Sequence, residues 1–498
     1  MHTRIHTALV SVLIATATSG ADVITVGPGL DAQTLTHALS LAADGDHIAI
    51  ASGTWSPPAP GGAAIHLIDR TLTIRALDAA VPPTLSGGAT GRAVIVEGGD
   101  IMLQDLILEG GTVPGGDING DSLTMDWERS GGAVTMSNAT VAVHTCTVNG
   151  GGAFHGGCIG AWWSNVSLQN VSLSAGMATF FGGAMRVHGG SLMIDSSGLS
   201  NCLADTGGAI VVGGGCEVQL SSVTVDACQA TFYGGGLCID GSQGAIDAAL
   251  DSVTVSNCAA GQSGGGLYIY GGSLDGEDLS ISGCSAADGG AIAAINTTCR
   301  VDSSSLSGNT ATSDGGGLWA YQSDVDVQQS LLQQHSAVYG GGVFLDWCAS
   351  ASFISTQWSS NDATLRGGAM YAVGSAGQDT GVVSCTVEDN TAGLGVDGVV
   401  FTDGNAGVVQ GSSFCGQDDH VGGTWTDLGG NTFADQCTGD VTCPGDLDGS
   451  NLIDMGDIVA LLSAWGPCSG QCDGDADEDG LIGVRDLISL LRRWGEGC

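Results

Sequence analysis

One short phrase recurs ten times through the middle of the chain: two glycines, a small residue and then an aliphatic residue. Successive copies lie 25 to 30 residues apart. A near-constant period of this length is typical of a solenoid, in which each unit buries its apolar side only against its neighbours. The ten aliphatic residues are Val134, Ile159, Met185, Ile210, Leu237, Leu267, Ile292, Leu318, Val343 and Met370.

The repeated unit has an internal pattern that predicts short strands. In one copy Val218 and Leu220 alternate with polar neighbours, and after two serines Val223 and Val225 alternate in the same way. Alternation with a period of two indicates β-strands, because successive side chains of a strand point to opposite faces. Short strands with glycine corners predict the turns of a parallel β-helix. Roughly fourteen turns spaced by ~4.8 Å would make a rod of about 70 Å.

A second column of residues precedes the glycines, each member two residues ahead of an alanine. Asparagine at stacked turns suits a hydrogen-bonded ladder, and cysteine at the same place is a small buried substitute. Disulfides between turns are an alternative, because a spacing of ~4.8 Å lies within the Cα separation that a disulfide spans. A metal-binding column is disfavoured, because no C-x-x-C pair occurs in it. The column consists of Cys202, Cys228, Cys258, Cys284, Asn309, His335, Asn361 and Asn390.

These paired signals, Asn-x-Ala at one corner and Gly-Gly-Ala-Ile or Gly-Gly-Gly-Leu at the next, resemble the repeats of polymorphic outer-membrane-protein-type β-helices. The wider resemblance is to the pectin-lyase-like right-handed parallel β-helix superfamily, over residues 22–437. It implies an all-β, right-handed parallel β-helix solenoid for residues 71–437. That superfamily contains lyases, hydrolases, adhesins and structural proteins, so the resemblance does not select a function.

The start of the chain predicts export and a capped solenoid. Arg4 precedes a mostly apolar run over residues 8–17, and small residues follow, which is typical of a signal peptide over 1–21. A buried N-terminal strand is the alternative. Residues 22–70 predict an N-terminal cap and first coil, because an amphipathic helix at 35–42 lies between strands at 23–26 and 47–50. Such a cap covers the open edge of the first turn.

The charge of the chain excludes some partners. Its eleven basic residues are all arginine, against 52 acidic residues, for a net charge of −41. Nucleic-acid binding depends on basic side chains that neutralise phosphates, and anionic membrane surfaces attract the same side chains. No segment after the signal peptide has the ~20 apolar residues of a membrane span. We therefore expect a secreted protein, extracellular or at the cell surface, without nucleic acid or a membrane span.

A different unit occurs twice near the C-terminus, 29 residues apart. Oxygen ligands at loop positions 1, 3, 5 and 12, with a backbone carbonyl at position 7, surround a hard cation such as Ca²⁺. The first loop is predicted to use Asp446, Asp448, Ser450, the Leu452 carbonyl and Asp457, with Asp454 acting through water. The second is predicted to use Asp475, Asp477, Asp479, the Leu481 carbonyl and Asp486. Because the second loop has one more carboxylate at the equivalent positions, we expect it to bind Ca²⁺ more tightly.

Each loop runs into an amphipathic helix. The apolar stripes are Ile458, Leu461, Leu462 and Trp465 in the first helix, and Leu487, Leu490, Leu491 and Trp494 in the second. We expect the two stripes to pack against each other. So small a unit needs stabilisation beyond its core, by metal or by disulfides. The possible disulfides involve Cys443, Cys468, Cys472 and Cys498, which allow three pairings, and their spacing does not choose between these pairings.

The two loop–helix units, over residues 446–494, resemble type-I dockerin repeats, so residues 438–498 are predicted to form a dockerin-like calcium-binding domain. The resemblance implies Ca²⁺ binding and docking onto a cohesin-like partner. Dockerins often carry a Ser/Thr pair at loop positions 10 and 11, where this chain has Met455-Gly456 and Val484-Arg485. The resemblance therefore supports calcium binding more strongly than it supports binding to a typical cohesin. A cell-surface protein is an alternative partner. Solvated aspartates without metal are the alternative to calcium binding.

Aromatic residues follow several of the Gly-Gly motifs at positions that should point outward. Exposed rings on successive turns could stack on sugar rings, so we hypothesise a glycan-binding column interrupted by Ala293. Alternatively, loops cover these rings, or the rings only stabilise the sheet. The proposed column comprises Tyr268, Tyr270, Trp319, Tyr321, Phe344 and Tyr371.

No group of residues meets the requirements of a catalytic site, so no catalytic residue is assigned. Outward candidates, namely Asp240, Asp346, His188 and Arg186, are scattered over different turns, and Asp275, Glu277 and Asp278 form a cluster typical of solvated loops. The favoured function is a non-catalytic β-helix for surface display, adhesion or glycan binding, attached through the calcium-binding module. The alternative is a carbohydrate-active enzyme, either a polysaccharide lyase or a glycoside hydrolase.

Overall fold

The computed structural model of the chain describes residues 20–113, 126–374, 379–417, 419–434, 436–437, 447, 455–467, 474 and 481–492. The chain divides into two compact units, Met1–Phe433 and Ala434–Cys498, which are described separately below. The predicted signal peptide lies almost entirely outside the described residues. No helix among these residues is long and apolar enough to cross a membrane.

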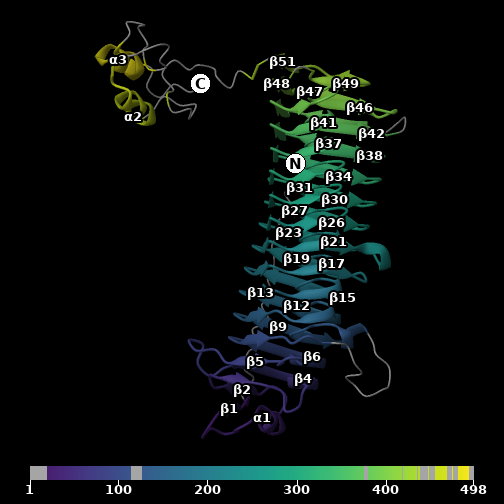
Figure 1. The fold of residues 1–498 in the computed structure, drawn as a ribbon, viewed down its shortest axis with the longest axis vertical. Coiled ribbons are helices and arrows are strands. Elements are labelled where there is room, and N and C mark those ends of the chain that lie inside the picture. The colour runs from purple at the N-terminus through teal and green to yellow at the C-terminus, as the bar shows by residue number, and fades with distance from the viewer. Residues whose placement is uncertain are drawn as a thin grey trace. The chain divides into compact units, whose positions relative to one another are not determined.

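Unit 1 is a parallel β-helix, as the period predicts. Its strands form sheets of 26, 15 and 10 strands, and Figure 1 shows the turns stacked one upon another. Every strand pair in the described part of the unit is parallel. Neighbouring turns are in register in sheets A and B, whereas several strand pairs of sheet C contain register shifts. The 26-stranded sheet, sheet A, bends at a corner within each typical turn. The 15-stranded sheet B and the 10-stranded sheet C complete the cross-section.

One turn from the middle of unit 1 shows how the repeat folds. It consists of β34 (Leu318–Tyr321) and β35 (Asp324–Gln328) of sheet A, β36 (Leu331–Gln333) of sheet B and β37 (Ser336–Tyr339) of sheet C. The corners between these strands have left-handed backbone at Gln322, Gln329 and Gln334. Because a polar residue with φ > 0 reverses the chain locally, each corner directs the following strand into the next sheet.

The Gly-Gly motif forms the corner between sheets C and A. Gly315 has φ of 64°, and a Cβ there would collide with the carbonyl of Leu318. A Cβ on Gly316 would collide with the carbonyl of Gly341, which is the equivalent glycine of the next turn. Both glycines are therefore required, the first by its backbone conformation and the second by the close approach of successive turns. The same close approaches recur at every turn that carries the motif, which explains its regular repetition.

The motifs precede strands of sheet A, and the other side of the corner is formed by sheet C. The sheet A strands are β8 (Val134–Ser137), β12 (Ile159–Gln169), β15 (Met185–Asp195), β18 (Ile210–Gly213), β22 (Leu237–Asp240), β26 (Leu267–Tyr270), β30 (Ile292–Ile295), β34, β38 (Val343–Asp346) and β42 (Met370–Val373). The sheet C strands are β11 (Gly152–His155), β14 (Met177–Phe181), β17 (Leu203–Thr206), β21 (Gln229–Tyr233), β25 (Ala259–Ala260), β29 (Ser285–Ala286), β33 (Thr310–Ala311), β37, β41 (Asp362–Arg366) and β45 (Thr391–Ala392).

The predicted asparagine ladder is present inside the solenoid. The backbone N–H of Cys284 donates to Oδ1 of Asn309 over 2.8 Å, and that of His335 donates to Oδ1 of Asn361 over 3.1 Å. Asn361 in turn donates from Nδ2 to Oδ1 of Asn390 over 2.9 Å. The cysteines of the same column are buried free thiols, so disulfides between these turns are absent among the described residues. Cys415 and Cys437 are disulfide-bonded.

The N-terminal end of the solenoid is capped by a short helix. Helix α1 (Leu35–Leu41) buries Leu35 and Ala38, and Oγ1 of Thr34 caps its N-terminus by accepting the backbone N–H of His37 over 3.2 Å. It lies between β1 (Val23–Val26) and β2 (His47–Ile50), as the sequence predicts. Strand β4 (Ala63–Ala76) crosses the predicted boundary at residue 70, so the cap passes into the rod within one continuous strand.

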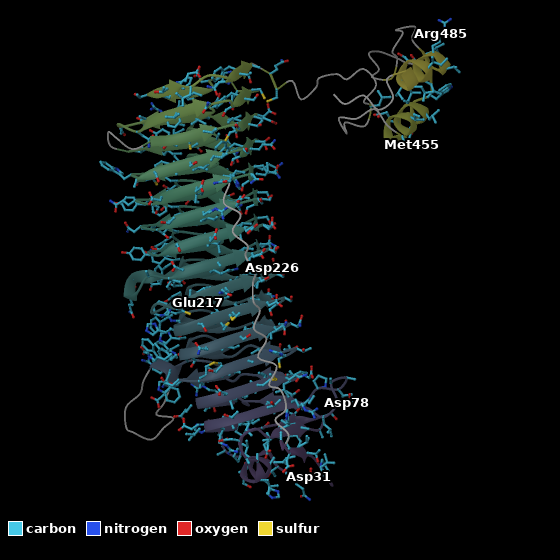
Figure 2. All side chains as sticks on the ribbon, turned by 180° about the vertical axis from the view of Figure 1, so that it is seen from behind. Asp31, Asp78, Glu217, Asp226, Met455 and Arg485 are labelled. Atoms are coloured by element: carbon cyan, nitrogen blue, oxygen red, sulfur yellow. The ribbon has the colours of Figure 1, made fainter. Side chains whose placement is uncertain are left out.

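Unit 2 contains two helices, α2 (Met455–Ser463) and α3 (Val484–Arg492), on which Figure 2 labels Met455 and Arg485. A two-residue antiparallel pairing joins β52 (Gly466–Pro467) to β53 (Leu481–Ile482). Its small core consists of the buried residues Leu461, Ile482 and Leu490, with Leu447, Ile458 and Leu487 packed against them.

The predicted apolar stripes of unit 2 are only partly correct. Leu462, Trp465 and Leu491 are about half exposed, at 51%, 45% and 48%. The core is narrower than expected because each helix contributes one line of side chains, at i and i+3, and the i+4 position faces outward. Trp494 lies outside the described residues.

Candidate functional site

The register of sheet A brings the predicted aromatic residues into two columns. Tyr268 pairs with Ala293, Ala293 with Trp319, Trp319 with Phe344, and Phe344 with Tyr371. The second column starts two residues later on each strand and contains Tyr270 and Tyr321, as well as the carboxylate of Asp346. The aliphatic residues between the columns are buried, so the alternation of inward and outward side chains is confirmed.

The aromatic residues differ in how far they are exposed. Tyr270 is 36% exposed, and Trp319, Tyr321 and Tyr371 are partly buried. Phe344 is only 8% exposed, so it is not the exposed platform that its outward position predicts. Its ring instead packs against the rings of Tyr339 and Tyr371.

Aromatic residues of sheet C form the other side of the same corner. The ring of Tyr339 lies 5.3 Å from that of Tyr371 and 6.5 Å from that of Phe344, between ring centroids. The ring of Tyr233 lies 4.8 Å from that of Tyr268. The first column lies next to this corner, so rings from sheet C contact rings from sheet A there and cover part of them. This arrangement explains the burial of Phe344.

Two aspartates occupy the sheet C side of the corner between these aromatic groups. Asp288 and Asp314 take the positions that Tyr233 and Tyr339 occupy on other turns. Burial and the neighbouring carboxylate of Asp288 raise the pKa of Asp314 to about 6, and burial raises the pKa of Asp288 and of Asp346. Asp288 and Asp314 are not among the site residues predicted from the sequence. Their position directly before a Gly-Gly motif is the feature that could have indicated them.

The outward candidates named from the sequence have different surroundings. Arg186 and His188 lie on one strand, β15, and Nη2 of Arg186 is 3.3 Å from Nδ1 of His188, so these two are not scattered. Asp240 accepts the backbone N–H of Ser242 at the next corner. In the expected acidic cluster, Asp275 forms an ion pair with Arg300 over 2.8 Å.

Three of the predicted calcium ligands lie within the described part of unit 2. Asp457 and Asp486, which close the two loops, are 0% and 2% exposed. Oδ1 of Asp457 accepts the N–H of Leu447 over 2.6 Å, and Oδ2 of Asp486 accepts the N–H of Gly483 over 2.7 Å. Leu481 is in β53. The remaining predicted ligands lie outside the described residues: Asp446, Asp448, Ser450, Leu452, Asp454, Asp475, Asp477 and Asp479.

The buried aspartates fit a hard cation by their chemistry, because carboxylates are rarely buried unless they are paired or bind metal. Among the described residues alone, no group of three or more His, Cys, Asp or Glu side chains is arranged to hold a metal ion. A calcium site in unit 2 would therefore need the loop residues that precede α2 and α3.

The fold places this chain in the class of parallel β-helix proteins. No protein-family model matches the chain, and no curated protein matches it. Among solved structures, the PL6 family alginate lyase AlyGC is 9% identical, with 83% of this chain and 100% of that chain covered and a TM-score of 0.22. An arginine-to-alanine variant of AlyGC has the same identity and coverage, with a TM-score of 0.20. Likeness at this level assigns neither activity nor substrate.

Proposed function

We propose that the protein binds an extended polysaccharide along the corner between sheets A and C, over the turns that carry Tyr268 to Tyr371. The observation that carries this proposal is the pair Trp319 and Tyr321 on β34. Their rings are stacked at 18° with centroids 6.3 Å apart, and both are partly exposed on one strand. Two nearly parallel, partly exposed rings at one level of the rod present apolar surface to solvent.

The surroundings of this pair suit a sugar polymer. Neighbouring turns are spaced by ~4.8 Å, so rings on successive turns follow the rod axis and match an extended ligand. The apolar faces of sugar rings stack on aromatic rings, while their hydroxyl groups need hydrogen-bond partners. Asp288, Asp314 and Asp346 supply acceptors beside the rings. A polymer rich in hydroxyl groups therefore fits the corner better than a strongly anionic one.

The rest of the chain supports a role outside the cell. In this proposal the signal peptide over 1–21 directs secretion, and the dockerin-like unit over 438–498 binds two Ca²⁺ ions and attaches the rod to a cohesin-like or cell-surface protein. Exposed apolar side chains occur at equivalent places on both helices of unit 2, which suits a protein partner. They are Met455, Val459 and Leu462 on α2, and Val484, Ile488 and Leu491 on α3.

The glycan proposal is tested with the purified full chain and a panel of neutral and acidic polysaccharides. Affinity electrophoresis measures binding to each polymer, and W319A/Y321A is compared with the wild type. We expect the double variant to lose about tenfold or more in affinity, because the stacking surface is removed. The matched control is W347A, which removes another exposed tryptophan at the corner after β38 and should bind as the wild type does. Equal binding by W319A/Y321A would overturn the proposal.

A carbohydrate-active enzyme is the second candidate, and one observation favours it. A carboxyl group with a pKa of about 6, such as Asp314, is suited to general acid–base catalysis near neutral pH. The same polysaccharide panel is assayed for new reducing ends, which a hydrolase produces, and for unsaturated ends, which a lyase produces. Release of either by the wild type and its loss in D314N would replace the binding role by a catalytic one.

A further inference from the structure

A cluster of basic and aromatic side chains lies on the same corner as the aromatic columns, but several turns closer to the N-terminus. Arg186 belongs to β15 and is only 6% exposed. Its guanidinium carbon lies 5.1 Å from the centroid of the Phe181 ring and 6.0 Å from that of Trp162. His155 stacks on Phe181 at 5.3 Å, and His188 lies 4.8 Å from Trp162, between ring centroids.

Among the residues that the structure describes, the guanidinium of Arg186 lacks partners for two of its nitrogen atoms. Nε and Nη1 are buried and make no hydrogen bond there, and only Nη2 has a neighbour, Nδ1 of His188. Arginine stays protonated in proteins, so burial does not remove this charge. A buried charged donor without an acceptor is strongly unfavourable. A ligand that supplies an acceptor to this guanidinium would remove that cost.

Arg92 shows what a purely structural arginine looks like in the same solenoid. It is also buried, at 3% exposure, but its Nε and Nη2 donate to the backbone carbonyls of Glu128, Ser130 and Gly131. Those carbonyls satisfy the guanidinium without any ligand. Arg186 has no such carbonyl cradle, and its guanidinium instead lies over Gly213, where a Cβ would be 3.0 Å from Nη2. The two buried arginines thus differ in the acceptors they are given, not in their burial.

Nearby groups neither neutralise Arg186 nor compete with it for an anion. No carboxylate of the described residues forms an ion pair with it, and Asp126 and Asp240 influence it only from a distance. Burial lowers the pKa of His155 to about 4 and lowers the pKa of His188, so both imidazoles are neutral at pH 7. Nδ1 of His155 is itself buried without a hydrogen-bond partner. One positive charge, unpaired among the described residues, is thus surrounded by neutral rings.

We propose that this cluster is a binding site for a carboxylate group, held by the guanidinium of Arg186 and enclosed by Trp162, Phe181 and the two histidines. A carboxylate matches the planar guanidinium because it accepts two parallel hydrogen bonds. The surrounding rings favour a carboxylate carried on a ring, such as an acidic sugar, over a fully hydrated small anion. Phe181 is 38% exposed, so the aromatic part of the cluster reaches solvent.

This site is separate from the glycan column and does not depend on it. Register places Arg186 three turns before Tyr268 in the same outward column, through Val211 and Cys238. W319A/Y321A should leave carboxylate binding unchanged, so the failure of one proposal is distinguishable from the failure of the other.

The test is a calorimetric titration of the full chain with galacturonate and with its neutral counterpart galactose, and acetate separates a ring-borne carboxylate from a free one. We expect galacturonate to bind, galactose not to bind, and acetate to bind more weakly than galacturonate. R186Q should weaken galacturonate binding about tenfold or more, and R186K should weaken it less, because lysine keeps the charge but loses the two-pronged geometry. R366Q is the control, because it removes an arginine from β41 on the same corner and should have no effect.

A second measurement keeps the proposal testable if R186Q does not fold. In the wild type, the imidazole resonances of His155 and His188 should shift on addition of galacturonate and stay in place with galactose. Equal binding of galacturonate and galactose, wild-type affinity in a folded R186Q, or no binding of either carboxylate would each overturn the proposal. Tighter binding of acetate than of galacturonate would contradict the preference for a ring.

Discussion

The two units of this chain obtain their stability in different ways. Unit 1 extends one apolar core through all its turns, and side chains as large as Trp358, Phe353 and Phe401 are fully buried in it. Among its described residues, unit 2 buries three apolar side chains in its core, and it also buries two carboxylates. Each turn of a solenoid buries its apolar side chains against the neighbouring turns. A unit as small as unit 2 needs a further source of stability. We therefore expect the two units to respond to different perturbations.

Removal of calcium should have the largest effect, and only on unit 2. Asp457 and Asp486 are buried at the ends of the two predicted calcium loops, so removal of a bound cation should withdraw its contribution to the stability of this unit. A calcium concentration 100-fold above the Kd of each of the two proposed sites would stabilise the unit by about 5.4 kcal/mol, twice the value for one site. Circular dichroism at the helical wavelengths and calorimetry with EDTA or excess Ca²⁺ should show one calcium-dependent transition beside an unchanged one. D486N should weaken the calcium dependence, and a calcium-independent melt of α2 and α3 would refute the metal site.

Substitution of a corner glycine should be the most damaging change in unit 1. G315A combines a left-handed backbone with a collision against the Leu318 carbonyl, and we expect it to lower the free energy of unfolding by about 3 to 5 kcal/mol. G308A is the matched control, because Gly308 has φ of 60° but open space around its Cβ position, so its cost should be about 1 to 2 kcal/mol. Denaturant unfolding of unit 1 measures both. Equal losses would show that backbone conformation alone requires the Gly-Gly motif.

The internal ladder should be more sensitive at its amides than at its thiols. N361A removes donors to Leu332 O and Asn390 Oδ1 and leaves the buried N–H of His335 without its acceptor. We expect a loss of about 2 to 4 kcal/mol. C228A removes a small buried group and should cost about 1 kcal/mol. The difference is measured in the same unfolding experiment, and a greater loss in C228A would show that the thiol does more than fill space.

The smallest expected effect concerns the acidic part of the corner. The pKa of Asp314 is raised to about 6 in the folded chain, so its ionisation opposes folding. This residue makes the stability of unit 1 decrease as the pH rises from about 4, the value of an unperturbed aspartate, through 6. D314N should remove that decrease and stabilise unit 1 at pH 7.5 by less than about 1 kcal/mol, because the side chain is partly exposed and its charge is screened by solvent. Thermal melts at pH 4.5 and 7.5 test this, and an unchanged pH dependence in D314N would contradict it.

Most of unit 1 follows from local signals in the sequence. The Gly-Gly motifs, the alternation around Val218 and Leu220, and the column that includes Asn309 and Asn361 each predict what is observed. The thiols of that column were ambiguous, because spacing permits disulfides that the structure does not contain. In unit 2 the helices follow from their periodicity, but the choice of buried positions does not. Eight of the predicted calcium ligands lie outside the described residues, so the metal site stays a prediction.

The sequence specifies the turn of this solenoid, because backbone conformation and alternation act within a few residues of each other. It also specifies which residues share an outward column, since the period is nearly constant. Only the three-dimensional fold decides which columns meet. Tyr339 covers Phe344, and His155 approaches Arg186, because sheets C and A turn toward each other at the glycine corner. The exposure of the aromatic rings and the surroundings of Arg186 depend on the angle between these sheets. That angle cannot be read from the spacing of residues within one strand.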